Sequence, residues 1–306
     1  MFRKYFVDFT LVLVAIIWAL NFSVVKIALT EIDPFSFNAL RYIFAFLLLI
    51  TVTWKRGFSL KVKREHFWKL VGLGLIGNLV YQGFFIIGIN YTYSANAAVM
   101  LGTIPIWVAL ISQFFTDEKL TALKTVGIFF AFLGICFIIV GGKDAISFAS
   151  ESFIGDLIII AAAVVWAIYT VLSKKYLRIY NSTQFSAFMA LVGLISLSLV
   201  GLPFLIKLNW SGISIVGYSG VIYSGLLSVG IAYLIWNNGL NKLGAIRTSS
   251  YQNLVPVLGL VFGVIILDEQ LTLFQYIGAA FVIAGIILAR KKTTQELTHS
   301  SNPSVR

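Results

Sequence analysis

Ten apolar stretches, each about twenty residues long, follow one another along almost the whole chain. A helix needs about 20 apolar residues to cross the roughly 30 Å hydrocarbon core of a bilayer. The gaps between the stretches are mostly too short to form a domain outside the membrane. The sequence therefore predicts an all-α polytopic membrane protein with ten transmembrane helices. They are expected near residues 8–29, 34–54, 68–89, 94–116, 121–141, 154–173, 184–204, 214–238, 245–267 and 272–289.

The composition excludes a soluble globular enzyme, a disordered chain and a disulfide-rich scaffold. Hydrophobic residues make up 59% of the 306 residues, and charged residues only 11%. A soluble domain carries about 25% charged residues, so this chain has too few charges to cover a surface that faces water. The single cysteine, Cys136, lies in an apolar stretch and has no second cysteine with which to form an internal disulfide.

The positive charges fall mainly on one side of the predicted topology. If both termini lie on the same side, that side receives nineteen of the 23 lysine and arginine residues. Cytoplasmic loops are enriched in these residues, so we expect both termini in the cytoplasm and the protein in the cell membrane. The net charge of +11 then reflects topology, and we expect no nucleic-acid partner.

The chain also contains an internal repeat. A shift of 151 residues superposes many identical residues, including Gly74, Gly88, Asn90, Pro105, Asp117, Glu118, Gly127 and Gly134 of the first copy. Near the start the shift is 148 residues and places Trp18 on Trp166. Five spans per copy is an odd number, so we expect two inverted five-helix repeats, residues 1–145 and 146–290. A disordered cytoplasmic tail, residues 291–306, is expected to follow them. Inverted repeats are typical of transporters, whose sites lie near the midplane between the copies.

The repeated motifs resemble those of a known family. They include Trp18-Ala19-Leu20-Asn21-Phe22, then Pro105 followed by Asp117-Glu118-Lys119-Leu120-Thr121, and in the second copy Pro256 followed by Asp268-Glu269-Gln270-Leu271-Thr272. Over residues 8–289 the chain resembles the EamA family of the drug/metabolite transporter superfamily. The resemblance implies transport of small organic metabolites such as amino acids and their derivatives, often by export. The second copy departs from the pattern, because Trp166 lacks the Asn-Phe that follows Trp18.

Several of these motif residues have a structural interpretation. Thr272 and Gln275 have the spacing of a capping box, and Thr121 can cap a helix in the same way. The paired acids lie in tight turns near helix starts, where negative charge is favoured. The glycines at seven-residue spacing allow helices to approach closely.

Two prolines are expected to break spans. Pro105 and Pro256 lie midway along the fourth and ninth stretches, where each removes a backbone hydrogen bond. Broken helices in membranes are tolerated where the backbone is buried or lines a cavity. The breaks can serve gating, or each can be a kink without function.

Polar and aromatic side chains within the spans are the candidate substrate-binding residues. An unpaired amide facing lipid costs several kcal/mol, so these side chains must face protein or a cavity. Asn78, Tyr81 and Gln82 follow i, i+3, i+4 spacing and are expected on one helix face. Hydrogen bonding between helices is the alternative role for each amide. The candidates are Trp18, Asn21, Arg41, Asn78, Tyr81, Gln82, Trp166, Tyr169, Tyr233, Gln252 and Asn253.

Two cations fall within the expected spans. Lys26 lies near the outer end of its span and can reach the interface, whereas Arg41 lies about 10 Å deep. Arg41 can pair with Glu31 or Asp33 in the neighbouring loop, or it can hold a carboxylate or phosphate group of a substrate. No carboxylate lies in the middle of a span, so the sequence suggests no proton relay.

These features favour a secondary transporter that works by alternating access around a midplane cavity. We expect an exporter of amino acids or related zwitterions and anions. Drugs, nucleobases and sugar or phosphate metabolites are alternative substrates, and a membrane sensor is a second class. The absence of a P-loop pattern argues against direct use of ATP.

An enzyme is not expected. Gly217-Tyr218-Ser219-Gly220 matches a short string found in intramembrane serine proteases. The two histidines, His66 and His299, are placed in a loop and in the tail, so this serine lacks a base at depth. We expect no cofactor and no metal, a monomer or a homodimer, and a small molecule and the lipid bilayer as partners.

Overall fold

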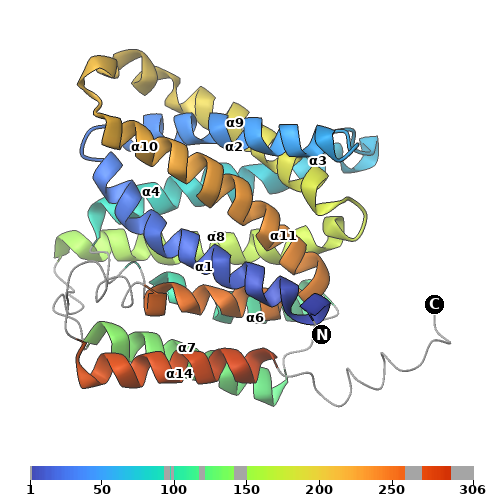
Figure 1. Ribbon diagram of the computed structural model, residues 1–306, viewed down its shortest axis with the longest axis vertical. Helices are drawn as coiled ribbons and strands as arrows, with labels where there is room; N and C mark the ends of the chain where they lie inside the picture. Colours follow the sequence, from blue (N-terminus) through green and yellow to red (C-terminus); the bar gives the residue numbers. More distant parts are fainter. Residues whose placement is uncertain are drawn as a thin grey trace.

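The computed structural model describes residues 2–92, 97, 100–116, 121–140, 150–258 and 271–290, and across these ranges it contains helices and no strands (Figure 1). Within the same ranges, six helical runs are long and apolar enough to cross a membrane: Tyr5–Ala28, Pro34–Lys55, Arg64–Tyr91, Phe153–Leu177, Ser182–Lys207 and Ile215–Leu243. Three shorter apolar helices cover Met100–Phe115, Ala122–Ile138 and Leu273–Leu288. The chain is therefore an α-helical, polytopic membrane protein.

The helices of the first copy follow the first, second, third and fifth expected stretches, whereas part of the fourth, 94–116, lies outside the described residues. They are α1 (Phe2–Ala28), α2 (Pro34–Lys55), α3 (Arg64–Gly74), the π-helix η1 (Leu75–Val80), α4 (Tyr81–Tyr91), α6 (Ile104–Phe115) and α7 (Ala122–Val140). Local chemistry fixes some of their ends. The Asp33 carboxylate accepts the backbone N–H groups of Phe35 and Ser36, each at 3.0 Å, and Pro34 is the first residue of α2.

The second copy has a similar order of helices. They are α8 (Ser150–Leu177), α9 (Ser182–Lys207), α10 (Ile215–Tyr223), the π-helix η3 (Ser224–Ile231), α11 (Ala232–Leu243), α12 (Ala245–Ser249), the 3-10 helix η4 (Ser250–Asn253) and α14 (Leu273–Arg290). A short 3-10 turn, η2 (Trp210–Gly212), precedes α10. The capping box at the start of α14 is confirmed, because the Gln275 side-chain oxygen accepts the Thr272 N–H at 2.8 Å.

Some sequence expectations lie outside the described residues. These are the boundary between the repeats near residue 145, the tail at 291–306, the later part of the expected ninth span, and the paired acids Asp117, Glu118, Asp268 and Glu269.

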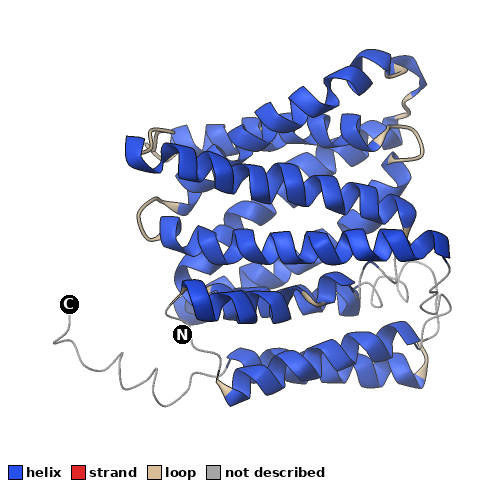
Figure 2. Cartoon of the chain, turned by 180° about the vertical axis from the view of Figure 1, so that it is seen from behind, coloured by secondary structure: helices blue, strands red, loops and turns tan. Residues whose placement is uncertain are grey.

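Helices α7 and α14 pack against each other at one edge of the molecule (Figures 1 and 2). A Cβ atom added at Gly134 would lie 2.5 Å from the Gly278 carbonyl oxygen, and one at Gly285 would lie 2.4 Å from that of Gly127. The predicted close approach at the repeated glycines is confirmed. Because Gly127 faces Gly285 and Gly134 faces Gly278, these two equivalent helices run antiparallel.

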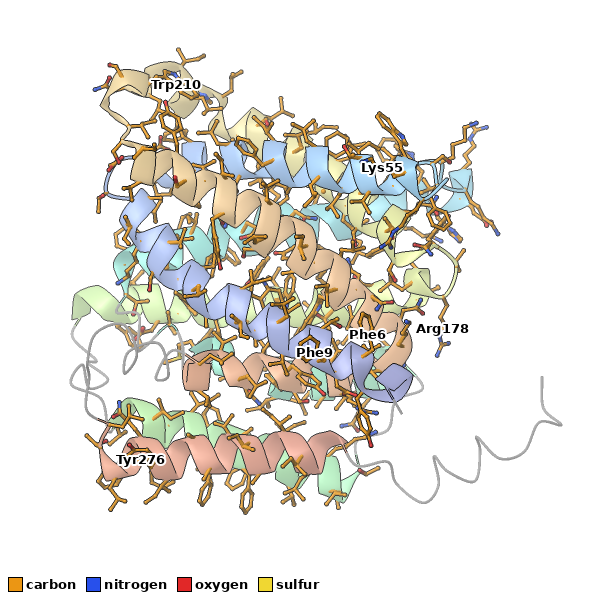
Figure 3. All side chains as sticks on the ribbon, viewed as in Figure 1. Phe6, Phe9, Lys55, Arg178, Trp210 and Tyr276 are labelled. Atoms are coloured by element: carbon orange, nitrogen blue, oxygen red, sulfur yellow. The ribbon has the colours of Figure 1, made fainter. Side chains whose placement is uncertain are left out.

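The two ends of the bundle differ in their side chains. Lys55 and Arg178 lie at the end where α1 begins, whereas Trp210 and Tyr276 lie toward the opposite end (Figure 3). Between the two ends, large apolar side chains such as Phe9, which is 71% exposed, project outward (Figure 3). In a polytopic protein such an apolar surface faces lipid rather than water.

Candidate functional site

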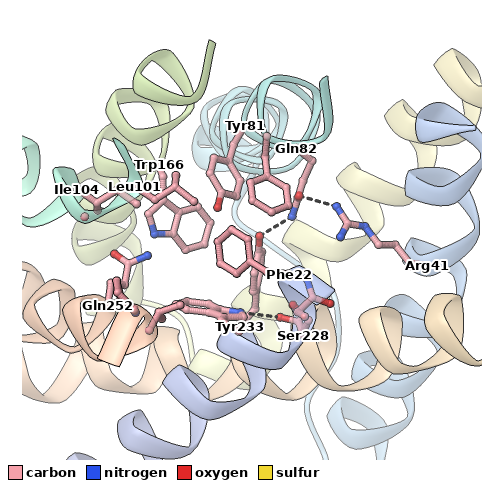
Figure 4. Close-up of a pocket in the computed structure, with 16 residues that line it drawn as sticks. Phe22, Arg41, Tyr81, Gln82, Leu101, Ile104, Trp166, Ser228, Tyr233 and Gln252 are labelled. Atoms are coloured by element: carbon pink, nitrogen blue, oxygen red, sulfur yellow. Dashed lines mark hydrogen bonds between the residues drawn. The ribbon is translucent and has the colours of Figure 1, made fainter. Parts of the chain in front are cut away.

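A cavity lies at the centre of the described helices and is lined by residues of both copies (Figure 4). It holds about 650 Å³ of space that no atom occupies, including solvent at its opening. Eight of the eleven candidate residues line it: Trp18, Asn21, Arg41, Tyr81, Gln82, Trp166, Tyr233 and Gln252. Pro256 also lines the cavity. The sequence pattern thus identified most of the polar lining.

Arg41 is the cation of this lining and is 1% exposed. Its Nη2 donates to the Gln82 side-chain oxygen at 2.6 Å, and its Nη1 donates to the Ser224 hydroxyl at 3.1 Å. The guanidinium carbon also lies 5.3 Å from the centre of the Phe37 ring. Within the part of the chain that the structure describes, Arg41 forms no ion pair and its Nε has no hydrogen-bond partner.

The ion pair of Arg41 with Glu31 or Asp33, which the sequence left open, is not formed. Glu31 accepts hydrogen bonds from the Ser214 backbone and hydroxyl, at 2.7 and 2.8 Å. Asp33 caps α2. Both acids are thus engaged at helix starts, and the Arg41 side chain is directed to the cavity instead. Lys26 is exposed and does not line the cavity.

Close packing of α2 against η3 explains the position of Arg41. A Cβ atom added at Gly225 would lie 2.4 Å from the Arg41 carbonyl oxygen, so only glycine allows the two backbones to approach this closely. This approach places the hydroxyl of Ser224 within reach of the guanidinium. A buried arginine in a membrane is costly to hold, which makes it a candidate functional residue.

Gln82 connects the cation to the second copy. Its side-chain oxygen accepts from Arg41, and its Nε2 donates to the Tyr233 hydroxyl at 2.7 Å (Figure 4). Nε2 also lies 3.4 Å from the Tyr42 hydroxyl, which in turn donates to the Asn78 side-chain oxygen at 2.8 Å. The network fixes the orientation of the Gln82 amide and holds Arg41 in place.

Aromatic rings form another part of the wall. Trp166 lies at the centre of this group, with ring centroids 4.6 Å from Tyr81, 5.2 Å from Tyr233 and 6.0 Å from Trp18. The Trp18 indole N–H donates to the Ser228 carbonyl at 3.2 Å, which ties α1 to η3. The wall therefore offers ring faces and edges beside the polar groups of Arg41 and Gln82.

Amide groups complete the polar lining. Asn21 and Gln252 both line the cavity, and their side-chain oxygens have no hydrogen-bond partner among the described residues. An amide oxygen is an acceptor that can receive a hydrogen bond from an ammonium or hydroxyl group of a bound solute.

Four of the predicted residues do not line the cavity. Asn78 is buried behind Gln82, where it accepts from Tyr42. Tyr169 stacks on Trp166 and packs over Gly77, where an added Cβ would lie 2.2 Å from its ring. Asn253 is buried in η4. Pro105 is buried near the start of α6. Asn78 and Gln82 both contact the Tyr42 hydroxyl and so lie on the same side of their helix, but of the three residues only Tyr81 and Gln82 line the cavity.

Both expected helix breaks are present in the backbone. Thr103 forms a turn before Pro105, which stands among the first residues of α6, a position that needs no amide donor. Near Pro256 the chain passes from α12 into the 3-10 helix η4 before it continues as an α-helix. The cavity is lined by Gly102 and Ile104 at one break and by Val255 and Pro256 beside the other.

Sequence reasoning missed several lining residues. Most are apolar: Phe22, Phe85, Leu101, Ile104 and Val255, which look like any other residue in an apolar span. Ser228 was also missed. Its equivalent in the π-helix of the first copy is Gly77, which has no polar side chain to point to the site. No three His, Cys, Asp or Glu side chains within the described ranges are close enough to hold a metal ion.

Comparison with known proteins shows the family of this chain. A model of the EamA-like transporter family matches residues 5–140 and, a second time, residues 153–290. The chain belongs to the EamA-like transporter family. Membership agrees with the apolar helices and makes the chain a multi-pass membrane transporter. The cavity described above is thus the candidate solute site of an EamA-like transporter.

Several curated relatives align with nearly the full length of this EamA-like chain. An uncharacterized transporter of Archaeoglobus fulgidus is 31% identical over 92% of this chain and 98% of its own. The uncharacterized transporter YyaM of Bacillus subtilis is 29% identical over 88% of each chain. A probable amino-acid metabolite efflux pump of Escherichia coli is 26% identical over 90% of this chain and 92% of its own. These relatives are named for transport and not for catalysis.

A solved crystal structure shares the fold of this EamA-like transporter. It superposes on 98% of this chain and 99% of its own with a TM-score of 0.78, at 22% sequence identity. Because the likeness extends over nearly all of both chains, it covers the arrangement of helices that surrounds the cavity.

Proposed function

We propose that this EamA-like transporter exports small zwitterionic or anionic metabolites, with amino acids and their derivatives as the first class to test. The observation that carries the proposal is Arg41. It is a buried cation in the cavity lining that forms no ion pair among the described residues. A carboxylate or phosphate group of a solute supplies the missing negative charge, and a guanidinium binds such groups with two parallel hydrogen bonds.

The rest of the lining suits the other end of a zwitterion. The amide oxygens of Asn21 and Gln252 can accept hydrogen bonds from an ammonium group. The rings of Trp18, Trp166 and Tyr81 offer faces that attract a cation. The name of the Escherichia coli relative, a probable amino-acid metabolite efflux pump, supports the same substrate class.

The proposed mechanism is alternating access by two inverted five-helix repeats, ten helices in all. Two findings support it. The equivalent helices α7 and α14 run antiparallel, and the cavity lies between residues of both copies. Inverted repeats that rock around a fixed midplane site expose that site to each side of the membrane in turn. We propose residues 1–145 and 146–290 as these repeats.

The proposed orientation places both termini in the cytoplasm of a cell membrane. The labelled residues Lys55 and Arg178 lie at the end of the bundle where α1 begins (Figure 3). Positive residues are retained on the cytoplasmic side, so this end is proposed to face the cytoplasm.

A screen of solutes on purified protein tests the substrate class. The panel contains amino acids, the matching amines and carboxylic acids, nucleobases and sugar phosphates. A solute that binds only the folded protein raises its melting temperature. We expect the solutes that carry a carboxylate to raise it, and Arg41→Ala to abolish that rise. Lys26→Ala is the matched control, because Lys26 is a cation of the same copy that does not line the cavity.

Movement of the solute distinguishes a transporter from a sensor. Proteoliposomes loaded with a labelled solute that raises the melting temperature should exchange it with unlabelled solute outside, and Arg41→Ala should stop this exchange. Equal melting shifts from amines and carboxylic acids would contradict the role of Arg41. Binding without any exchange would contradict transport and favour a sensor.

A further inference from the structure

Two buried aspartates occupy equivalent places in the two copies. The shift of 148 residues that places Trp18 on Trp166 also places Asp8 on Asp156. Asp8 lies near the start of α1 and is 6% exposed, and Asp156 lies near the start of α8 and is 3% exposed. Helices α1 and α8 begin at opposite ends of the bundle (Figures 1 and 2). Among the described residues, each end therefore contains one buried aspartate, outside the lining of the cavity described above.

Asp8 joins the first copy to the second. Its Oδ1 accepts from the Tyr251 hydroxyl and lies 3.3 Å from Nη2 of Arg247. Both partners belong to α12 and η4, which lead to the residues Val255 and Pro256 of the cavity wall. The Asp8 contact therefore spans the boundary between the copies at the end where α1 begins.

Helices of both copies pack closely beside the Asp8 contact. A Cβ atom added at Gly239 would lie 3.0 Å from the Leu11 side chain and 3.1 Å from that of Thr248. Helices α1, α11 and α12 therefore meet there. Tyr251 is buried in the same hydrophobic cluster as Leu11.

Asp156 joins the second copy to the first at the other end. Its Oδ1 accepts from the Thr92 hydroxyl at 2.5 Å, directly after α4 ends. A Cβ atom added at Gly155 would lie 2.7 Å from the carbonyl carbon of Tyr91, so the start of α8 is pressed against this segment. The Asp156 contact is thus also a link across the boundary between the copies.

The surroundings of the two aspartates match as well. At one end Gly239 faces Leu11, and at the other end Gly88 faces Ile159, where an added Cβ would lie 2.7 Å from the Ile159 side chain. The shift of 151 residues places Gly88 on Gly239, and the shift of 148 places Leu11 on Ile159. The same local interface is therefore built twice, once at each end, with one aspartate beside it each time.

We propose that Asp8 and Asp156 hold the two ends of the transport path closed, and that opening the path at one end breaks the aspartate contact of that end. The inference rests on the proposed alternating access. Movement of α1 away from α12 and η4 separates Asp8 from Arg247 and Tyr251 and exposes the cavity at the end where α1 begins. The equivalent movement of α8 away from the end of α4 separates Asp156 from Thr92. A charged hydrogen bond within a buried interface is strong while formed and weak once water reaches it, which suits a contact that must break in each cycle.

Side-specific labelling of the cavity tests this proposal without any substrate. Cys136 is replaced by serine, and Ser228→Cys places a single thiol in the cavity lining. A membrane-impermeant maleimide is added to sealed vesicles of each orientation, which are identified by a tag on the N terminus. The rate of labelling from each side then reports the fraction of protein that is open to that side.

Asp8→Asn should raise labelling from the side of the N terminus by about tenfold, the effect of losing one charged hydrogen bond. Asp156→Asn should raise labelling from the opposite side by a similar factor. Glu65→Gln is the matched control, because this exposed acid pairs only within the first copy, with Lys63 and His66 among the described contacts. It should leave both rates unchanged.

Milder variants keep the test decisive if an aspartate variant does not fold. Tyr251→Phe keeps the ring and removes the hydroxyl that donates to Asp8, and Thr92→Val does the same for the donor to Asp156. They should change labelling in the directions of Asp8→Asn and Asp156→Asn respectively. The proposal is overturned if folded variants at both ends label like the control, or if both ends change labelling from the same side. Loss of solute exchange with normal labelling shifts would count against the proposed substrate and not against this inference.

Discussion

Gln82 donates a hydrogen bond of 2.7 Å to the hydroxyl of Tyr233, and the two residues stand 151 positions apart in the sequence. This separation is the shift that relates the two copies, so both side chains occupy the same place in their repeat. Two other equivalent pairs are in ring contact: Trp18 with Trp166 and Phe130 with Phe281. Residues on a pseudo-twofold axis meet their own equivalents, so these pairs lie along the axis that relates the copies.

Tyr233→Phe should destabilise the protein although it removes a single oxygen atom. The Nε2 donor of Gln82 would keep only the 3.4 Å contact with Tyr42, and a buried donor without a good partner costs about 1–3 kcal/mol. We expect the free energy of unfolding in detergent, measured by chemical denaturation, to fall by about that amount. Tyr218→Phe is the control, because the Tyr218 hydroxyl donates to Trp210 at an exposed site. Equal losses of unfolding free energy in both variants would show that the hydrogen bond from Gln82 to Tyr233 does not stabilise the protein.

Gln252→Leu should weaken binding of the ammonium end of a zwitterion without weakening binding of its carboxylate end. If the Gln252 oxygen accepts from the solute ammonium, the variant loses affinity for an amino acid by about tenfold, the usual effect of one lost hydrogen bond to a charged group. Affinity for the matching carboxylic acid, which lacks the ammonium, should remain unchanged. Titrations monitored by melting temperature measure both affinities. A parallel loss for the two solutes would show that Gln252 shapes the cavity without contacting the ammonium.

Much of the fold was readable from the sequence because lipid imposes a simple rule on it. Every spanning segment must be apolar and must satisfy its own backbone, so the apolar stretches mark the helices. The repeat was also visible as identical residues in register, and the structure gives these residues equivalent places: Pro105 and Pro256 stand at helix breaks, Gly127 faces Gly285, and Gly134 faces Gly278. The prolines interrupt helices, and the glycines allow close helix packing, in both copies.

The details of the site were less readable, for reasons that differ between residues. Glu31 and Asp33 are close to Arg41 in the sequence, which suggests them as ion-pair partners, but Asp33 caps the start of α2 and Glu31 accepts hydrogen bonds at the start of α10. Asn78 lies on the same side of its helix as Gln82, as the spacing predicts, but its side chain is buried against Tyr42 and does not line the cavity. Phe22 belongs to the repeated motif that begins at Trp18, but its apolar side chain gives no sign that it lines a cavity, because that role follows from the packing of α1 against other helices.

Gly134→Val should disrupt the packing of α7 against α14. The added side chain would begin 2.5 Å from the Gly278 carbonyl oxygen, a backbone atom that cannot move aside independently of its helix. We expect a marked loss of the monodisperse peak in size-exclusion chromatography and a lower melting temperature. Gly72→Val is the control, because an added Cβ at Gly72 meets no atom within 4 Å. Normal behaviour of Gly134→Val would mean that the two helices can separate without harm.

Phe22→Ala should enlarge the cavity and change which solutes it accepts. Phe22 lines the cavity and contacts Phe85 edge-to-face, with ring centroids 5.8 Å apart. Removing the ring leaves space that a bulkier solute can fill, whereas a small solute loses its contacts with the ring. A difference of one or two methylene groups is worth about tenfold in such a pocket, so the ratio of exchange rates for large and small solutes should rise by about that factor. Phe9→Ala, on the same helix but 71% exposed, should leave the ratio unchanged. If Phe22→Ala slows the exchange of all solutes equally, the ring supports the position of α1 and does not limit the size of the solute.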